Sequence, residues 1–158
     1  MSRSGAVQLI CVFLLIAFIG VSFFGREDTD KAAAEIAEAV TAQVSTEGLQ
    51  EFGSERLFSQ LGLSGEDFDS FVYYGSEDIM DVREILIIRG REDSDLDAVK
   101  AHIGKKAEEK YSTYKDYDPV ASALLEKRVL EVSSGAIIYI VHDDAASGRE
   151  AFLRCVED

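Results

Sequence analysis

The stretch REILIIR, residues 83–89, decides the fold of this chain. Four apolar residues stand between charged ones without the alternation of a half-exposed strand, which indicates a strand in mid-sheet, covered on both faces or nearly so. Residues 69–74, DSFVYY, form its expected partner strand, which ends at Gly75. We therefore expect a pair of strands that is joined by the loop of residues 76–82.

A second pair of strands follows later in the chain. Residues 129–132 and 136–141 are apolar runs separated by SSG at 133–135, which is typical of a hairpin turn. The order of strand, strand and Asp-capped helix occurs twice, at 69–111 and 128–156, although the two copies share few identical residues. The sequence thus predicts an α+β fold with a four-stranded, mainly antiparallel sheet and helices packed on it.

Five segments carry helix signals, which combine apolar residues at helical spacing with a capping side chain at the start. The expected helices are residues 31–45, residues 55–60 after Ser54, a long helix after Asp93 or Ser94, a short helix from Pro119 to Lys127, and a last helix after Asp143 and Asp144. The clearest start signal is Asp118 followed by Pro119, because proline is favoured at the first helical position.

The N-terminal segment predicts a membrane anchor. Residues 6–24 are apolar apart from two uncharged polar side chains. At about 1.5 Å per residue, such a helix approaches the roughly 30 Å thickness of the bilayer's hydrocarbon core. Arg3 and the amino terminus precede the segment, whereas the mainly acidic residues 26–30, REDTD, follow it, so we expect the N-terminal side to be cytoplasmic. We expect residues 1–25 to be a single-pass anchor that crosses the cell membrane through residues 6–24, with a cytoplasmic N-terminus and an extracytoplasmic domain at 26–158.

Two other kinds of leader fit this segment less well. Residues 20–22, GVS, offer small side chains to signal peptidase, but the cut would leave an apolar pair beginning at Phe23. A cleaved signal peptide is therefore the alternative to an uncleaved anchor. A lipoprotein leader is excluded, because Cys11 stands near the start of the apolar run rather than after it.

The charge balance narrows the classes of partner. The chain has 30 acidic and 16 basic side chains, a formal net charge of −14. Such a surface repels phosphate backbones, so we expect no nucleic acid partner. The same charge favours cations, basic peptides or basic protein surfaces as partners. The two cysteines, Cys11 and Cys155, lie in the apolar run and near the C-terminus, so neither a disulfide nor a thiolate metal site is expected.

Short motifs along the chain carry a family resemblance. They are Glu84 to Ile88, Asp95 to Val99, Tyr117 with Pro119, and Gly135 to Val141. With the leader and the alanine-rich first helix, these motifs make the chain resemble a bacterial family known as domain of unknown function 4358, over most of residues 30–156. Many members are similar to lipoproteins of Gram-positive bacteria, whereas this chain lacks the lipid-attachment cysteine. The resemblance implies an exported domain and no particular activity.

Two acidic segments are candidates for chemistry. Residues 92–97 alternate aspartates as a calcium loop does, but the positions that require Gly and Glu hold Ala98 and Gly104. His142 beside Asp143 could act as a general base or a metal ligand, yet no nucleophile motif or phosphate-binding loop accompanies it. We expect no catalytic, metal or cofactor site. The alternatives are a hydrolase or metal-dependent enzyme that uses His142 and Asp143, and a weakly calcium-responsive surface protein.

Three tyrosines, Tyr111, Tyr114 and Tyr117, recur at every third position just before Pro119. Aromatic clusters favour interfaces because they bury a large area at low entropic cost, although these rings could instead fill the core edge between two helices. We predict that they are the interaction surface of a non-catalytic binding or accessory module of the bacterial cell envelope. Its expected partner is an envelope protein or a basic peptide.

Overall fold

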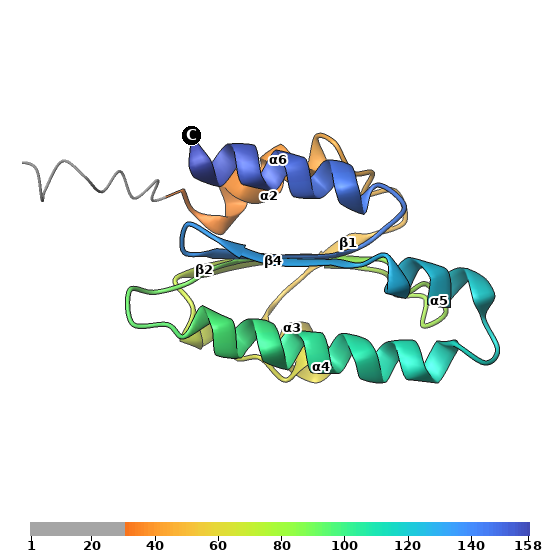
Figure 1. Cartoon of the computed structure of the whole chain (residues 1–158). Coiled ribbons are helices and arrows are strands. Elements are labelled where there is room, and N and C mark those ends of the chain that lie inside the picture. The colour runs from red at the N-terminus through yellow and green to blue at the C-terminus, as the bar shows by residue number, and fades with distance from the viewer. Residues whose placement is uncertain (1–30) are drawn as a thin grey trace, which may run out of the picture. The chain divides into compact units, whose positions relative to one another are not determined.

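A single sheet with helices on both faces organises this domain. The computed structural model describes residues 31–158 and places a five-stranded sheet between two layers of helices (Figure 1). The predicted anchor, residues 1–25, and its transmembrane helix at 6–24 lie outside the described residues. Among residues 31–158, no helix combines the length and the apolar character that crossing a membrane requires.

The sheet is antiparallel throughout. Its strands are β1 (Gln50–Phe52), β2 (Ser70–Gly75), β3 (Glu84–Arg89), β4 (Val129–Ser133) and β5 (Ala136–Val141). They lie in the order β1-β2-β3-β5-β4, and each pair of neighbours is antiparallel. The mid-sheet position predicted for β3 is therefore confirmed, and all of its residues are buried.

The predicted four-stranded sheet is wrong, because β1 adds a fifth strand at the edge. β1 has three residues, which pair with residues 73–75 of β2. A strand this short, with two of its side chains exposed, carries neither an apolar run nor the alternation by which a strand is recognised in a sequence. The fold remains α+β, with one more strand than expected.

Helices cover both faces of the sheet. They are α2 (Ala33–Thr41), α3 (Ser54–Leu61), α4 (Leu96–Tyr114), α5 (Pro119–Glu126) and α6 (Ala145–Glu157), with a short 3₁₀ helix, η1 (Gly65–Asp67). α2 and α6 lie on one face, whereas α3 and α4 lie on the other (Figure 1). Asp118 caps α5 as predicted, since its carboxylate accepts hydrogen bonds from two backbone N–H groups. The N-cap of α4 is Asp95 rather than Asp93 or Ser94.

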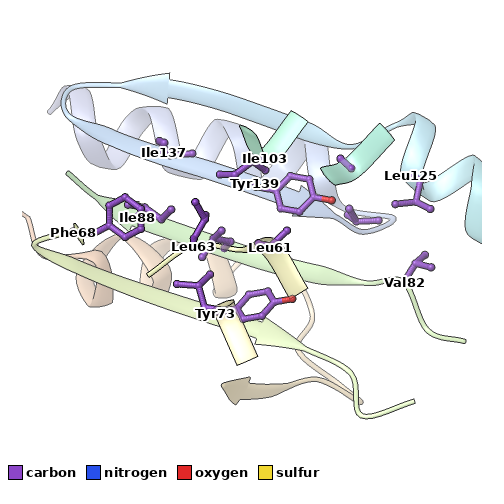
Figure 2. Packing of buried hydrophobic residues seen from close by; sticks show 14 of the residues in the cluster. Leu61, Leu63, Phe68, Tyr73, Val82, Ile88, Ile103, Leu125, Ile137 and Tyr139 are labelled. Atoms are coloured by element: carbon purple, nitrogen blue, oxygen red, sulfur yellow. The ribbon is translucent and has the colours of Figure 1, made fainter. Parts of the chain in front are cut away.

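The side chains of β3 alternate between two apolar cores. Leu86 and Ile88 belong to the core under α3 and α4, part of which Figure 2 shows. Ile85 and Ile87 belong to the core under α2 and α6. Successive side chains of a strand point to opposite faces, so a strand with a core on each side is apolar at every position. This arrangement explains the unbroken apolar run in the sequence.

Gly148 of α6 is packed tightly against a strand of the sheet and the segment after α2. A Cβ atom at this position would lie 2.5 Å from Cδ1 of Ile140 and 2.8 Å from Cγ2 of Val44. Gly104 of α4 is in a different setting, because a Cβ there would meet only Cδ2 of Leu130 at an ordinary 3.5 Å. The close approach of α6 therefore depends on a residue without a side chain.

We expect the Gly148→Ala substitution to destabilise the domain. Alanine in place of glycine inside a helix normally stabilises by about 1 kcal/mol, but overpacking of a core costs about 1–3 kcal/mol. The free energy of unfolding, measured by urea denaturation, should fall by up to about 2 kcal/mol. The matched control Gly104→Ala should raise it by about 0.5–1 kcal/mol. Equal stabilisation by both substitutions would show that the contact at Gly148 is not tight.

Candidate functional site

A hollow opens on the α3–α4 side of the sheet, where β2 leads into β3. Its volume is about 370 Å³, and its lining includes Tyr73, Glu84 and Tyr139 from three neighbouring strands. The other walls come from α3, α4 and the β2–β3 loop, residues 76–83. The hydroxyl groups of Tyr73 and Tyr139 point toward the same end of the sheet, where Val82 lies (Figure 2). Polar groups from several elements therefore meet in the hollow.

Glu84 is a buried carboxylate at the start of the apolar strand, and only 3% of its surface is exposed. Its Oε2 accepts a hydrogen bond from the Tyr73 hydroxyl at 2.8 Å. Its Oε1 accepts from the Tyr139 hydroxyl at 3.0 Å and from Nζ of Lys110 at 2.9 Å. The sheet register creates this cluster, because both tyrosines lie opposite Leu86, the next residue of β3 on the same face. A buried charge persists when it is paired and hydrogen-bonded in this way.

Both tyrosines are held in their neutral, hydrogen-donating form. Burial raises the pKa of Tyr73 strongly, and the nearby charge of Glu84 raises it further. The same two causes raise the pKa of Tyr139 well above its usual value. Neither hydroxyl can act as a base near neutral pH, and three donors engage the oxygens of Glu84. The cluster therefore forms a hydrogen-bonded polar floor of the hollow.

Two further ion pairs lie around the hollow. Nη2 of Arg83 lies 2.6 Å from Oδ2 of Asp81, and Nε of Arg83 donates to Oδ1 of Asp81 at 2.9 Å. These hydrogen bonds lower the pKa of the Asp81 carboxyl and raise the pKa of the Arg83 guanidinium. On α4, Nζ of Lys106 lies 3.3 Å from Oε2 of Glu109. The first pair lies within the β2–β3 loop and the second lies on the surface of α4.

The structure places the three predicted interface tyrosines in different surroundings. Tyr111 and Tyr114 are half-buried and pack against the core under α4. Tyr117 is 58% exposed, and its ring centroid lies 5.4 Å from that of Tyr114. The hydroxyl of Tyr114 donates to the backbone oxygen of Ile79 at 2.7 Å. Tyr114 thus joins the β2–β3 loop to the end of α4, while Tyr117 presents its ring to solvent.

Exposed apolar side chains gather around Tyr117. Of the five large hydrophobic residues exposed in the described part of the chain, four are Ile79 (81%), Met80 (51%), Tyr117 and Val120 (74%). We name these four residues the apolar corner. Ile79 and Met80 come from the β2–β3 loop, and Tyr117 and Val120 come from the region where α5 starts; both regions lie at one end of the domain (Figure 1). Tyr114 contacts both regions. Sequence reasoning found Tyr117 and missed the others, although the apolar pair in the acidic loop was a usable signal.

The structure does not bring His142 and Asp143 to the hollow. His142 is buried, and its Nδ1 accepts the backbone N–H of Asp144 at 3.0 Å, while Asp143 is exposed. The acidic segment at 92–97 leads into α4 and supplies its N-cap. Within the described residues, no group of three His, Cys, Asp or Glu side chains is arranged to hold a metal ion. The hollow and the apolar corner are therefore the features with the clearest binding geometry.

Comparison with known proteins gives one match. A family model described as "Domain of unknown function (DUF4358)" matches residues 29–142, which include all five strands of the sheet. No curated protein and no solved structure matches the chain.

The two buried tyrosines predict a loss of stability at high pH. Their folded-state pKa values lie above about 10, the value of an exposed tyrosine, so the folded state keeps protons that the unfolded state releases. Their contribution is fully present below pH 10 and is lost as the pH rises toward the folded-state pKa. The free energy of unfolding should fall by up to about 1.4 kcal/mol per pH unit for each tyrosine.

Urea denaturation at a series of pH values above 10 measures this slope. The Tyr73→Phe variant should show a shallower slope than the parent chain, and the Tyr73→Phe/Tyr139→Phe variant should show the shallowest. If the parent and the double variant share one slope, the burial of the two hydroxyls does not control alkaline stability.

Proposed function

Because the chain belongs to the DUF4358 family, whose function is unknown, its own surface has to indicate its role, and we propose that it is a non-catalytic binding module. Its partner is a basic protein or peptide of the bacterial cell envelope, which docks on the apolar corner. The observation that carries the proposal is the gathering of exposed apolar side chains at one end of an otherwise acidic domain.

The apolar corner has the character of a protein-binding surface. Single exposed hydrophobic residues are normal, but a group of them with a polar border is typical of an interaction site. Tyr117 is well suited to such a surface, because an aromatic ring buries a large area and loses few rotatable bonds. The hydrogen bond from Tyr114 to the backbone of Ile79 ties the loop to α4, so part of the surface is organised before a partner arrives.

The charges around the apolar corner favour a basic partner. Glu77, Asp78 and Asp116 are exposed beside it, against one exposed lysine, Lys115. The whole chain, these residues included, carries a formal net charge of −14. This field attracts a basic surface and repels the anionic head groups of a membrane. A basic protein therefore fits the corner better than a lipid surface does.

The cluster around Glu84 supports binding over catalysis. Its carboxylate accepts hydrogen bonds from Tyr73, Tyr139 and Lys110, and both tyrosines have raised pKa values. Catalysis of acyl or phosphoryl transfer needs an activated nucleophile or a base that can take up a proton. Near neutral pH the two buried tyrosine hydroxyls stay protonated, so they serve as hydrogen-bond donors in a scaffold.

We expect the domain to work on the outer side of the cell membrane. Arg3 before the apolar run at 6–24, and acidic residues at 27–30 after it, favour export of the domain at 26–158. Protease added to cells without their wall should digest the domain and spare a cytoplasmic control protein. Protection of the domain in intact cells, with digestion only after lysis, would contradict this location.

Photo-crosslinking tests the apolar corner. A photoreactive phenylalanine analogue replaces Tyr117 in the full chain, expressed in the native host, and irradiation should give a protein adduct. Position 58 is a matched control, because Phe58 is also aromatic and is 64% exposed but lies on α3. The adduct should form from position 117 and not from position 58. The substitutions Ile79→Asp and Val120→Asp should each reduce the yield of the adduct at least about fivefold, because burying a charge in an apolar contact costs more than about 1 kcal/mol.

The identity of the adduct decides between kinds of partner. Mass spectrometry should find a protein with basic residues around the cross-linked position, and added salt should lower the yield because it screens charge attraction. Equal adducts from positions 117 and 58 would contradict a defined docking surface. Adducts with lipid alone from position 117 would assign the apolar corner to the membrane instead.

A further inference from the structure

We infer that the hollow beside Glu84 is a binding site for a small zwitterion, a molecule with one carboxylate and one ammonium group, such as an amino acid or a short peptide. The inference rests on the charges that face the hollow from α3, α4, β3 and the β2–β3 loop. Eight charged residues line it, four of each sign, and six of them form three ion pairs. The other two, Arg56 and Asp78, form no ion pair among residues 31–158.

Arg56 offers a carboxylate site. Its guanidinium lies over the ring of Phe52, 4.9 Å from the ring centroid, which leaves the N–H groups at its edge available. None of its side-chain donors has a hydrogen-bond or ion-pair partner among residues 31–158, and the residue is only half-exposed. A planar guanidinium binds a carboxylate through two parallel hydrogen bonds, and such charge-assisted pairs are the strong ones.

Asp78 offers an ammonium site on another wall of the hollow. Its Oδ1 accepts the backbone N–H of Met80 at 2.9 Å, which orients the carboxylate and leaves Oδ2 without a partner among the described residues. Arg56 comes from α3 and lies close enough to Tyr73 to oppose the rise in its pKa. Asp78 comes from the β2–β3 loop and acts on Tyr114, whose pKa burial raises first and Asp78 raises further. The two charges therefore approach the hollow from different elements and beside different side chains.

The size of the hollow suits a ligand of this class. Its volume of about 370 Å³ lies at the low end of the roughly 300–1,000 Å³ that small-molecule sites span. Phe52, Tyr114 and Ile79 provide apolar surface for the body of the ligand. A nucleotide or sugar phosphate fits less well, because its negative charges would face one unpaired cation and several carboxylates. One carboxylate and one ammonium match the two unpaired charges.

The zwitterion site and the apolar corner share part of the β2–β3 loop, because Ile79 belongs to both and Asp78 lies beside the corner, but the two are tested separately. Arg56 is not part of the apolar corner, and a zwitterion site requires no protein partner. Failure of the cross-linking experiment would leave this site standing, and failure of the ligand experiment would leave the apolar corner standing.

The test uses the full chain and ligand-observed NMR with the standard amino acids and alanyl-alanine at millimolar concentration. At least one of these probes should bind. The N-acetyl derivative of the best binder keeps only the carboxylate, and the carboxamide derivative keeps only the ammonium. Each derivative should bind at least about 10-fold more weakly than the parent ligand, because each loses one charge-assisted contact. No binding by any probe, or an N-acetyl derivative that binds as well as its parent, would overturn the zwitterion site.

Matched variants assign the two contacts. Arg56→Gln should weaken binding of the parent ligand about 10-fold and leave the carboxamide derivative unaffected, since that derivative has no carboxylate to lose. Asp78→Asn should weaken binding of the parent ligand about 10-fold and leave binding of the N-acetyl derivative unaffected, since that derivative has no ammonium group to lose. The controls Arg91→Gln and Asp93→Asn remove the same charges from exposed positions outside the hollow and should change nothing. Unaltered affinity in Arg56→Gln, with an unaltered melting temperature, would overturn the assignment.

Discussion

The burial of β3 on both faces is the constraint on which the rest of this structure depends. Every residue of the strand is buried, and its side chains alternate between two separate cores. One layer of helices could cover only one of these faces, so the chain has to place α2 and α6 on one side and α3 and α4 on the other. The close approach of α6 at Gly148 and the length of α4 both serve this double cover.

Glu84 introduces a charge at the beginning of the same strand and thereby determines where polar chemistry lies. A carboxylate that is 3% exposed requires donors, which Tyr73, Tyr139 and Lys110 supply. These partners come from β2, β5 and α4, so one buried charge aligns three elements at one end of the sheet. The hollow borders this cluster, in which three donors hold the Glu84 carboxylate in place.

The β2–β3 loop connects the two candidate binding features. Asp78 and Ile79 of this loop line the hollow, and Ile79 and Met80 are exposed in the apolar corner. A partner docked on the apolar corner would contact the same loop that supplies the ammonium site of the hollow. The two features nevertheless use different physical interactions, since the apolar corner relies on buried area and the hollow relies on unpaired charge.

The sequence by itself determined the features that depend on near neighbours. The apolar run of 85–88 identified a strand covered on both faces, Asp118 before Pro119 marked the start of α5, and short motifs placed the chain in its family. Only the tertiary structure decided the edge strand β1, the cluster around Glu84 and the apolar corner. Periodicity and capping act within a few residues, whereas Glu84 meets Tyr139 across 55 positions of the chain. Contacts over such distances follow from strand order and register, which no local pattern in this sequence encodes.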